Sequence, residues 1–132
     1  MRYLPDTQVW IDYLNGGYPA LTKRLQETPP DDLRLSTVVL AELRCGAESG
    51  PQTARNHGRV DLLVREVPVA EFDTEAAMVY GRLRGLLQRQ GVRIGPYDLM
   101  IASHAISLGC ILVTNDTGLA QVRSLEVEDW RQ

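Results

Sequence analysis

Residues 110–118 read CILVTNDTG, and this stretch decides the fold. Cys110 to Val113 is apolar at every position, which is typical of a strand buried on both faces of a parallel sheet. The turn residues of Asn115 to Gly118 end that strand. The strand comes directly after a helix, predicted over 97–108 and closed by Gly109. A buried strand that follows a helix in this way indicates an α/β fold.

The rest of the chain repeats this alternation of short strands and helices. It predicts one α/β domain over residues 1–132, a three-layer sandwich whose short, mostly parallel central sheet is flanked by helices. A chain of this length can bury a core without disulfides or metals, and we find no internal repeat or linker. Strands are predicted at 3–5, 33–35, 64–69, 110–113 and 124–127, and helices at 7–14, 20–26, 38–47, 53–63, 74–90 and 97–108.

Composition excludes several classes of protein. Hydrophobic residues make up 44% and charged residues 23%, and no apolar run approaches the roughly 20 residues of a membrane helix. The N-terminus lacks the apolar stretch of a signal peptide, so we expect a cytoplasmic protein with no membrane partner. Cys45 and Cys110 both have apolar neighbours and are predicted to be free core residues. The net charge is −3, although thirteen of the fourteen basic residues are arginines.

Four acidic residues occupy places where core side chains would be expected. Asp6 and Asp116 each follow a predicted strand, and ligands of open parallel sheets bind at that rim. Asp98 opens a helix, where the dipole favours negative charge. Glu42 shares a helix face with Val38 and other apolar positions, so it should point inwards. Acidic residues are rarely buried unless they are paired or bind a metal, so this placement needs an explanation.

Each acid also has a purely structural explanation. Asp6 and Asp98 could be helix caps and Asp116 a turn residue, whereas Glu42 is harder to explain in this way. As a group they are costly, because two like charges about 4 Å apart repel by roughly 4 kcal/mol at an effective dielectric near 20. A cation or raised pKa values would relieve this repulsion. Oxygen ligands alone favour Mg²⁺ or Mn²⁺, and such ions activate water for phosphodiester hydrolysis.

At these residues the chain resembles the PIN-domain ribonucleases, specifically the VapC toxin of a VapBC-type toxin–antitoxin pair. The resemblance runs from end to end. It covers YLPDTQVWIDYL from residue 3, STVVLAELRCG from residue 36, GPYDLMIASHA from residue 95 and ILVTNDTGLAQVRSLEVEDW from residue 111. The chain departs from the family at Gln8, where Asn or Ser is usual, and at Pro5, where an aliphatic residue is usual.

The resemblance implies a metal-dependent endoribonuclease that is silenced by a bound antitoxin. It implies Mg²⁺ or Mn²⁺ as the cofactor, RNA as the substrate, and a homodimer in the cytoplasm. The target RNA and the number of metal ions stay open. The implied catalytic residues and metal ligands are Asp6, Glu42, Asp98 and Asp116, and Thr114, Thr7 and Gln8 are implied to orient them.

The main alternative is a non-catalytic α/β binding module whose acids are helix caps and turn residues. A receiver-like phosphoacceptor domain would need a lysine beside the site, and Lys23 is the only lysine. His104 does not share the helix face of Asp98 and is predicted to be a packing or interface residue. His57 lies in a polar run and is predicted to be solvated. Arg82, Arg84 and Arg89 are predicted to lie on exposed flanks of their helix.

Overall fold

The computed structural model describes residues 2–132, which contain six α-helices and five short strands. The strands are β1 (Tyr3–Pro5), β2 (Leu35–Ser36), β3 (Val69–Ala70), β4 (Ile111–Val113) and β5 (Val127–Glu128). The helices are α1 (Thr7–Asn15), α2 (Pro19–Glu27), α3 (Thr37–Ala47), α4 (Thr53–Glu66), α5 (Thr74–Arg89) and α6 (Pro96–Leu108). Two short 3₁₀ helices, Pro30–Asp32 and Thr117–Gln121, complete the described structure.

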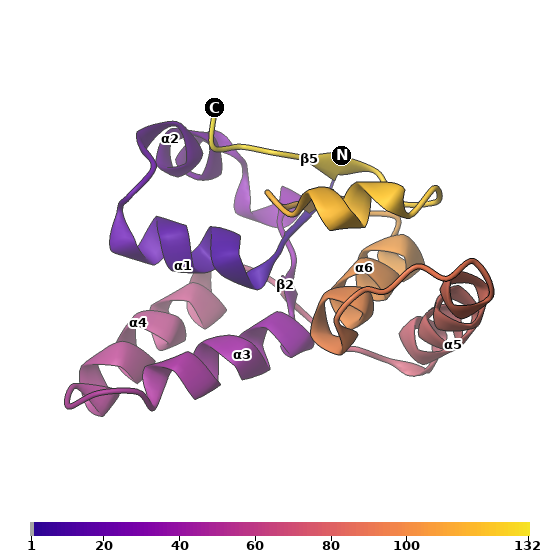
Figure 1. The fold of residues 1–132 in the computed structure, drawn as a ribbon. Coiled ribbons are helices and arrows are strands. Elements are labelled where there is room, and N and C mark those ends of the chain that lie inside the picture. The colour runs from indigo at the N-terminus through magenta and orange to yellow at the C-terminus, as the bar shows by residue number, and fades with distance from the viewer. Residues whose placement is uncertain (1) are drawn as a thin grey trace.

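All strand pairs are parallel. One sheet has the order β1-β4-β5 and the other pairs β2 with β3. A parallel bridge between Tyr3 and Leu33 links the two sheets. The central strand β4 is buried at every residue, as its apolar sequence predicts. In Figure 1, α1 to α4 lie on one side of the strands and α5 and α6 on the other, which confirms the predicted α/β sandwich.

The core is formed where the helices meet the sheet. Leu4 and Leu112 from the strands and Trp10 from α1 are essentially inaccessible to solvent. Helix α6 packs against β4, α3 and α5. It is apolar on most sides, which explains why the buried residues of α6 run without a break from Ile101 to Ala105. Trp130 is also buried, and this brings the C-terminal segment onto Tyr3 of the first strand.

The structure corrects three strand boundaries. Residues 64–66 continue α4 rather than form a strand, because the spacing of Val60, Leu63 and Val64 suits a helix face. Val67 is extended and precedes Pro68, which ends the helix, so β3 begins only at Val69. The strand predicted at 33–35 is paired at Leu35–Ser36, and the one predicted at 124–127 is paired at Val127–Glu128.

The cysteine prediction is confirmed only in part. Neither Cys45 nor Cys110 forms a disulfide in the described structure. Cys110 is buried before β4, but Cys45 is exposed, because the face of α3 that it shares with Val38 is buried only at the N-terminal end of the helix. No helix within residues 2–132 combines the length and the apolar character that crossing a membrane requires.

Candidate functional site

Asp6 is fixed at the point where β1 becomes α1. Its backbone N–H donates to the carbonyl of Val113 at 2.9 Å, which ties it to the end of the neighbouring strand. One carboxylate oxygen caps α1 by accepting from the N–H of Val9 at 2.9 Å, and the other accepts from the Thr114 hydroxyl. The residue is only 8% exposed. Asp6 is therefore the N-cap of α1, as its structural explanation predicts. Its negative charge has no basic partner in the described structure.

Burial raises the pKa of Asp6 above its ordinary value. The hydrogen bonds from Thr114 and Val9 act in the opposite direction, since both favour the charged carboxylate. The nearby charges of Asp98 and Asp116 add to the increase. Residues from three distant parts of the chain thus influence one carboxyl group, so they lie close together in the fold.

Thr114 and Asp116 are positioned by the end of β4. The N–H of Thr114 donates to the carbonyl of Glu128 at 3.0 Å, and its hydroxyl accepts from the N–H of Asp116 at 3.0 Å. The Asp116 side chain accepts from the N–H of Gly118 at 2.8 Å and so caps the following 3₁₀ helix. Thr114 therefore connects Asp6 with the loop of Asp116.

Glu42 comes from the middle of α3 and meets the start of α1. The Thr7 hydroxyl donates to the Glu42 carboxylate at 2.6 Å. Glu42 is half-buried, while Cys45 and Gly46 on the same face are exposed. The prediction that this face points to the interior is confirmed only at Val38 and Val39, which are buried, because from Glu42 onwards the face opens on solvent and on the pocket that the four acids line (the acidic pocket).

Asp98 lies in the first turn of α6 and is exposed. Gly95 is the N-cap of this helix, so Asp98 is not the cap that a purely structural explanation requires. Although the residue is exposed overall, its carboxyl group lines the acidic pocket and is partly desolvated there, which raises the pKa of Asp98; the charges of Asp116 and Glu42 raise that pKa further. The helix dipole at this end favours the ionised form and partly offsets the cost.

These four carboxylates line one pocket of about 540 Å³. Thr7, Gln8, Ile11 and Asn115 complete the lining, so within the part of the chain that the structure describes the pocket contains no basic residue. The side chains are not drawn into a compact cluster: among residues 2–132, no three acidic, histidine or cysteine side chains are grouped closely enough to hold a metal ion as they lie. Asp6, Glu42 and Asp116 each accept hydrogen bonds from different donors.

A buried ion pair beside the acidic pocket was not predicted from the sequence. Asp12 is 8% exposed, and its carboxylate receives Arg131 at 2.6 and 3.1 Å. Gln8 donates to the other oxygen of Asp12 at 2.9 Å, so Gln8 lines the pocket while holding this ion pair rather than one of the four acids. The spacing of Gln8 and Asp12, four residues apart on a helix, was the available signal.

Both histidines lie outside the acidic pocket. His104 is 1% exposed, contacts the Ser36 hydroxyl through Nδ1 at 2.8 Å and stacks edge-on with Phe72. Burial lowers its pKa. It is a packing residue, as predicted.

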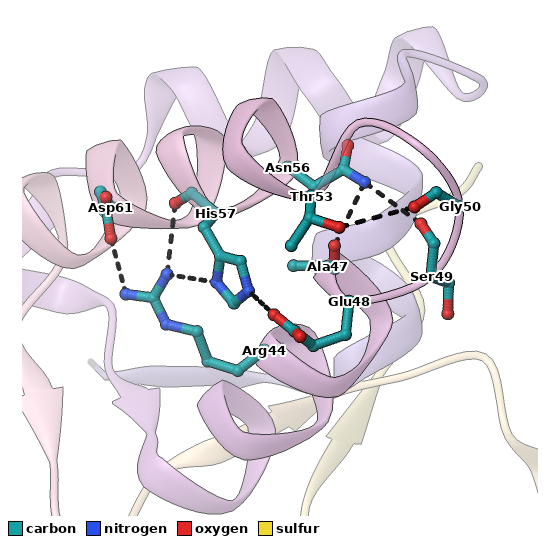
Figure 2. Close-up of polar contacts among 9 residues, drawn as sticks. All are labelled: Arg44, Ala47, Glu48, Ser49, Gly50, Thr53, Asn56, His57 and Asp61. Carbon is teal, nitrogen blue, oxygen red and sulfur yellow. Dashed lines mark hydrogen bonds and ion pairs between the residues drawn. The ribbon is translucent and has the colours of Figure 1, made fainter.

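The prediction that His57 is solvated was wrong. Figure 2 shows His57 between Arg44 and Glu48 in a polar cluster that joins α3 to α4. Arg44 donates to His57 Nδ1 at 3.1 Å and also to Asp61 at 2.7 Å. Because Nδ1 accepts from Arg44, the ring donates to Glu48 through Nε2. The cluster clamps the two helices together and contributes no residue to the acidic pocket.

Comparison with known proteins gives this geometry a context. A family model described as PIN domain matches residues 3–125. The tRNA(fMet)-specific endonuclease VapC of Shigella flexneri is 35% identical over 131 residues, which is 98% of each chain. Ribonuclease VapC2 of Rickettsia felis is 30% identical over 132 residues, again 98% of each chain. Among solved structures, the DNA-bound VapBC of Salmonella typhimurium gives a TM-score of 0.92 at 31% identity, with 98% of both chains covered.

Proposed function

The chain belongs to the PIN domain family and is a VapC-type ribonuclease toxin, and from this premise we propose that it cuts RNA with the help of Mg²⁺ or Mn²⁺. The proposed metal ligands and catalytic residues are Asp6, Glu42, Asp98 and Asp116. The observation that supports them is one pocket lined by all four carboxylates and by no basic side chain of the described residues.

The donor set fits a hard divalent cation. The polar side chains of the lining offer carboxylate, amide and hydroxyl oxygens and neither thiolate nor imidazole, which favours Mg²⁺ or Mn²⁺ over zinc. Asp98 and Asp116 are exposed and Glu42 is half-buried, so these three can rotate towards an ion while the buried Asp6 keeps its position. Burial is the main cause of the raised pKa values of Asp6 and Asp98, and a bound cation would remove the charge repulsion that adds to it.

When bound, the cation would polarise a phosphate oxygen of the RNA and lower the pKa of a water molecule. The residues of this chain would supply position and charge. The Thr114 hydroxyl donates to one carboxylate oxygen of Asp6 and accepts from the backbone N–H of Asp116. The Thr7 hydroxyl donates to the Glu42 carboxylate. These donors are neutral, so they orient the carboxylates without cancelling the negative charge that would attract the cation.

Substrate and partners follow from the relatives. We propose RNA as the substrate class, with initiator tRNA as the first candidate because the Shigella relative is named for tRNA(fMet). We propose a VapB-like antitoxin as the partner, since the Salmonella and Rickettsia structures are VapBC complexes bound to DNA. A homodimer and a cytoplasmic location complete the proposal.

The binding-module alternative keeps one observation in its favour, because Asp6 and Asp116 do cap helices. Asp98→Asn separates the two functions, with the exposed Asp31→Asn as the matched control. We expect the wild type and D31N to cleave RNA in Mg²⁺ and to melt at a higher temperature with Mg²⁺ than with EDTA. D98N should lose cleavage and the Mg²⁺-induced rise. Retained cleavage in D98N, or melts that ignore Mg²⁺ in every variant, would reject the metal-dependent mechanism.

A further inference from the structure

The charge of this chain is unevenly distributed along its sequence. Between Glu75 and Asp98 there is no acidic residue, yet this segment carries four arginines: Arg82, Arg84, Arg89 and Arg93. The whole chain has a net charge of −3, so this local excess stands against the overall balance. The segment forms most of α5 and the loop that leads into α6 (Figure 1).

Arg84 and Arg93 line a second pocket, of about 590 Å³, between α5 and the start of α6. Both side chains are exposed, and within residues 2–132 neither has a carboxylate oxygen within 4.0 Å. Arg84 donates one N–H to the hydroxyl of Tyr80 at 2.9 Å. This neutral partner holds the guanidinium in place and leaves its charge uncompensated, with further N–H groups free to donate.

The remaining lining is largely apolar. Leu87, Val92 and Leu99 are among the residues that form it. A nucleotide has a charged phosphate and a sugar and base with extensive apolar surface, so two guanidinium groups beside an apolar wall match both parts of it. A carboxylate-rich peptide would match the arginines but not the wall.

This pocket adjoins the acidic pocket through the first turn of α6. Pro96 and Leu99 line the arginine pocket, whereas Asp98 lines the acidic one. One turn of α6 thus contributes residues to both linings, so a polynucleotide strand that crosses the start of α6 would reach both pockets.

We propose that the arginine pocket binds a nucleotide next to the cleaved bond, with Arg84 and Arg93 contacting a backbone phosphate of single-stranded RNA. This inference rests on the proposed function, because it extends the path of the same substrate. In this proposal the carboxylates act at the phosphate that is cut, and the arginines bind a neighbouring phosphate of the same strand.

The test compares two double variants of the full chain with the same change in charge. R84Q/R93Q removes both arginines of the pocket, and R82Q/R89Q removes two arginines of the same segment that do not line it. Binding of a labelled single-stranded RNA is measured by fluorescence anisotropy in EDTA, where cleavage cannot interfere, at several salt concentrations. Thermal melts and light scattering follow the fold and the molecular mass of each variant.

We expect R84Q/R93Q to raise Kd about tenfold or more and to lower the slope of log affinity against log salt by about 0.7, because the two arginines contact one phosphate and each neutralised phosphate of a single strand contributes about 0.7. R82Q/R89Q should change the slope by less than half as much. Tyr80→Phe, which frees Arg84 but keeps the fold, should raise Kd by a smaller factor. In Mg²⁺, R84Q/R93Q should raise KM for RNA more than it lowers kcat.

Equal effects of the two double variants would overturn the proposal, as would an unchanged Kd in R84Q/R93Q. A change of molecular mass in R84Q/R93Q without a change of Kd would assign the pocket to contact between two copies of the chain, and would also overturn it. Failure of the wild type to cleave RNA in Mg²⁺ or Mn²⁺ would instead count against the proposed function. The binding and cleavage assays therefore distinguish the two failures.

Discussion

Thr114→Val tests how the acidic pocket is held together. The substitution keeps the volume of the side chain but replaces the hydroxyl that donates to Asp6 and accepts from the N–H of Asp116. Thr114 is only 2% exposed, so water cannot replace either contact. A hydrogen bond to a charged group contributes about 1.5–3 kcal/mol, and a neutral one about 1 kcal/mol. We expect the free energy of unfolding to fall by about 2.5–4 kcal/mol at neutral pH, which is the sum of the two contributions.

The assay is thermal unfolding in EDTA, with the exposed Thr117→Val as the control. In a chain of 132 residues the expected loss corresponds to a Tm lower by about 10–16 °C. The Thr114 bond lowers the pKa of Asp6, so its contribution is present when Asp6 is ionised and is lost as the pH falls through that pKa. The deficit of T114V should therefore shrink as the pH is lowered towards 4.

Two results would refute this reasoning. A T114V protein that melts within 2 °C of the wild type at pH 7.5 would show that the hydroxyl does not stabilise the buried carboxylate. A deficit that stays constant down to pH 4 would show that the loss comes from packing rather than from Asp6. The same variant should need about 10–100 times more Mg²⁺ for half-maximal cleavage, since outer contacts of metal ligands contribute that much to affinity.

Two further predictions concern stability. The pKa of Asp98 is raised, first by partial desolvation of its carboxyl group, so ionisation of Asp98 opposes folding. D98N in EDTA should therefore be more stable than the wild type at pH 8, and this advantage should vanish as the pH falls through that pKa towards 4. Urea unfolding at several pH values measures the advantage, and an advantage that grows on acidification would contradict the prediction. Arg131→Met removes the partner of the buried Asp12, and urea unfolding should show a free energy of unfolding lower by about 2–3 kcal/mol. This is less than the roughly 3–5 kcal/mol of a fully buried pair, because the Arg131 side chain is 23% exposed. An unchanged midpoint would mean that this ion pair does not anchor the C-terminal segment.

The sequence predicted the elements of the fold better than their ends. The apolar run of β4 and the periodicity of the helices depend on local composition, which is visible in one chain. The end of α4 was misplaced because Val64 suits a strand and a helix face equally well, and only the contacts of its helix with α3 decide between them. Cys45 was misplaced for a similar reason, since the orientation of α3 depends on distant partners.

The acidic pocket could be predicted as a group of residues but not as a geometry. Asp6 and Asp12 lie six residues apart and are equally buried, yet one is held by Thr114 and the other by Arg131. Both partners are more than a hundred residues away along the chain, so no local pattern reveals which acid is neutralised. Gln8 was assigned to the wrong carboxylate for the same reason.

The different partners of Asp6 and Asp12 also bear on function. An acid that only supports the fold is stabilised most simply by a nearby cationic side chain, as Arg131 does for Asp12. Asp6, Glu42 and Asp116 are held instead by hydroxyl and backbone N–H groups, which fix the direction of a carboxylate and leave its charge in place. Retaining several negative charges around one pocket costs stability. In the proposed mechanism a bound cation offsets that cost. Arg84 and Arg93, whose charge is permanent, line the other pocket, where we propose that they contact a phosphate of the RNA.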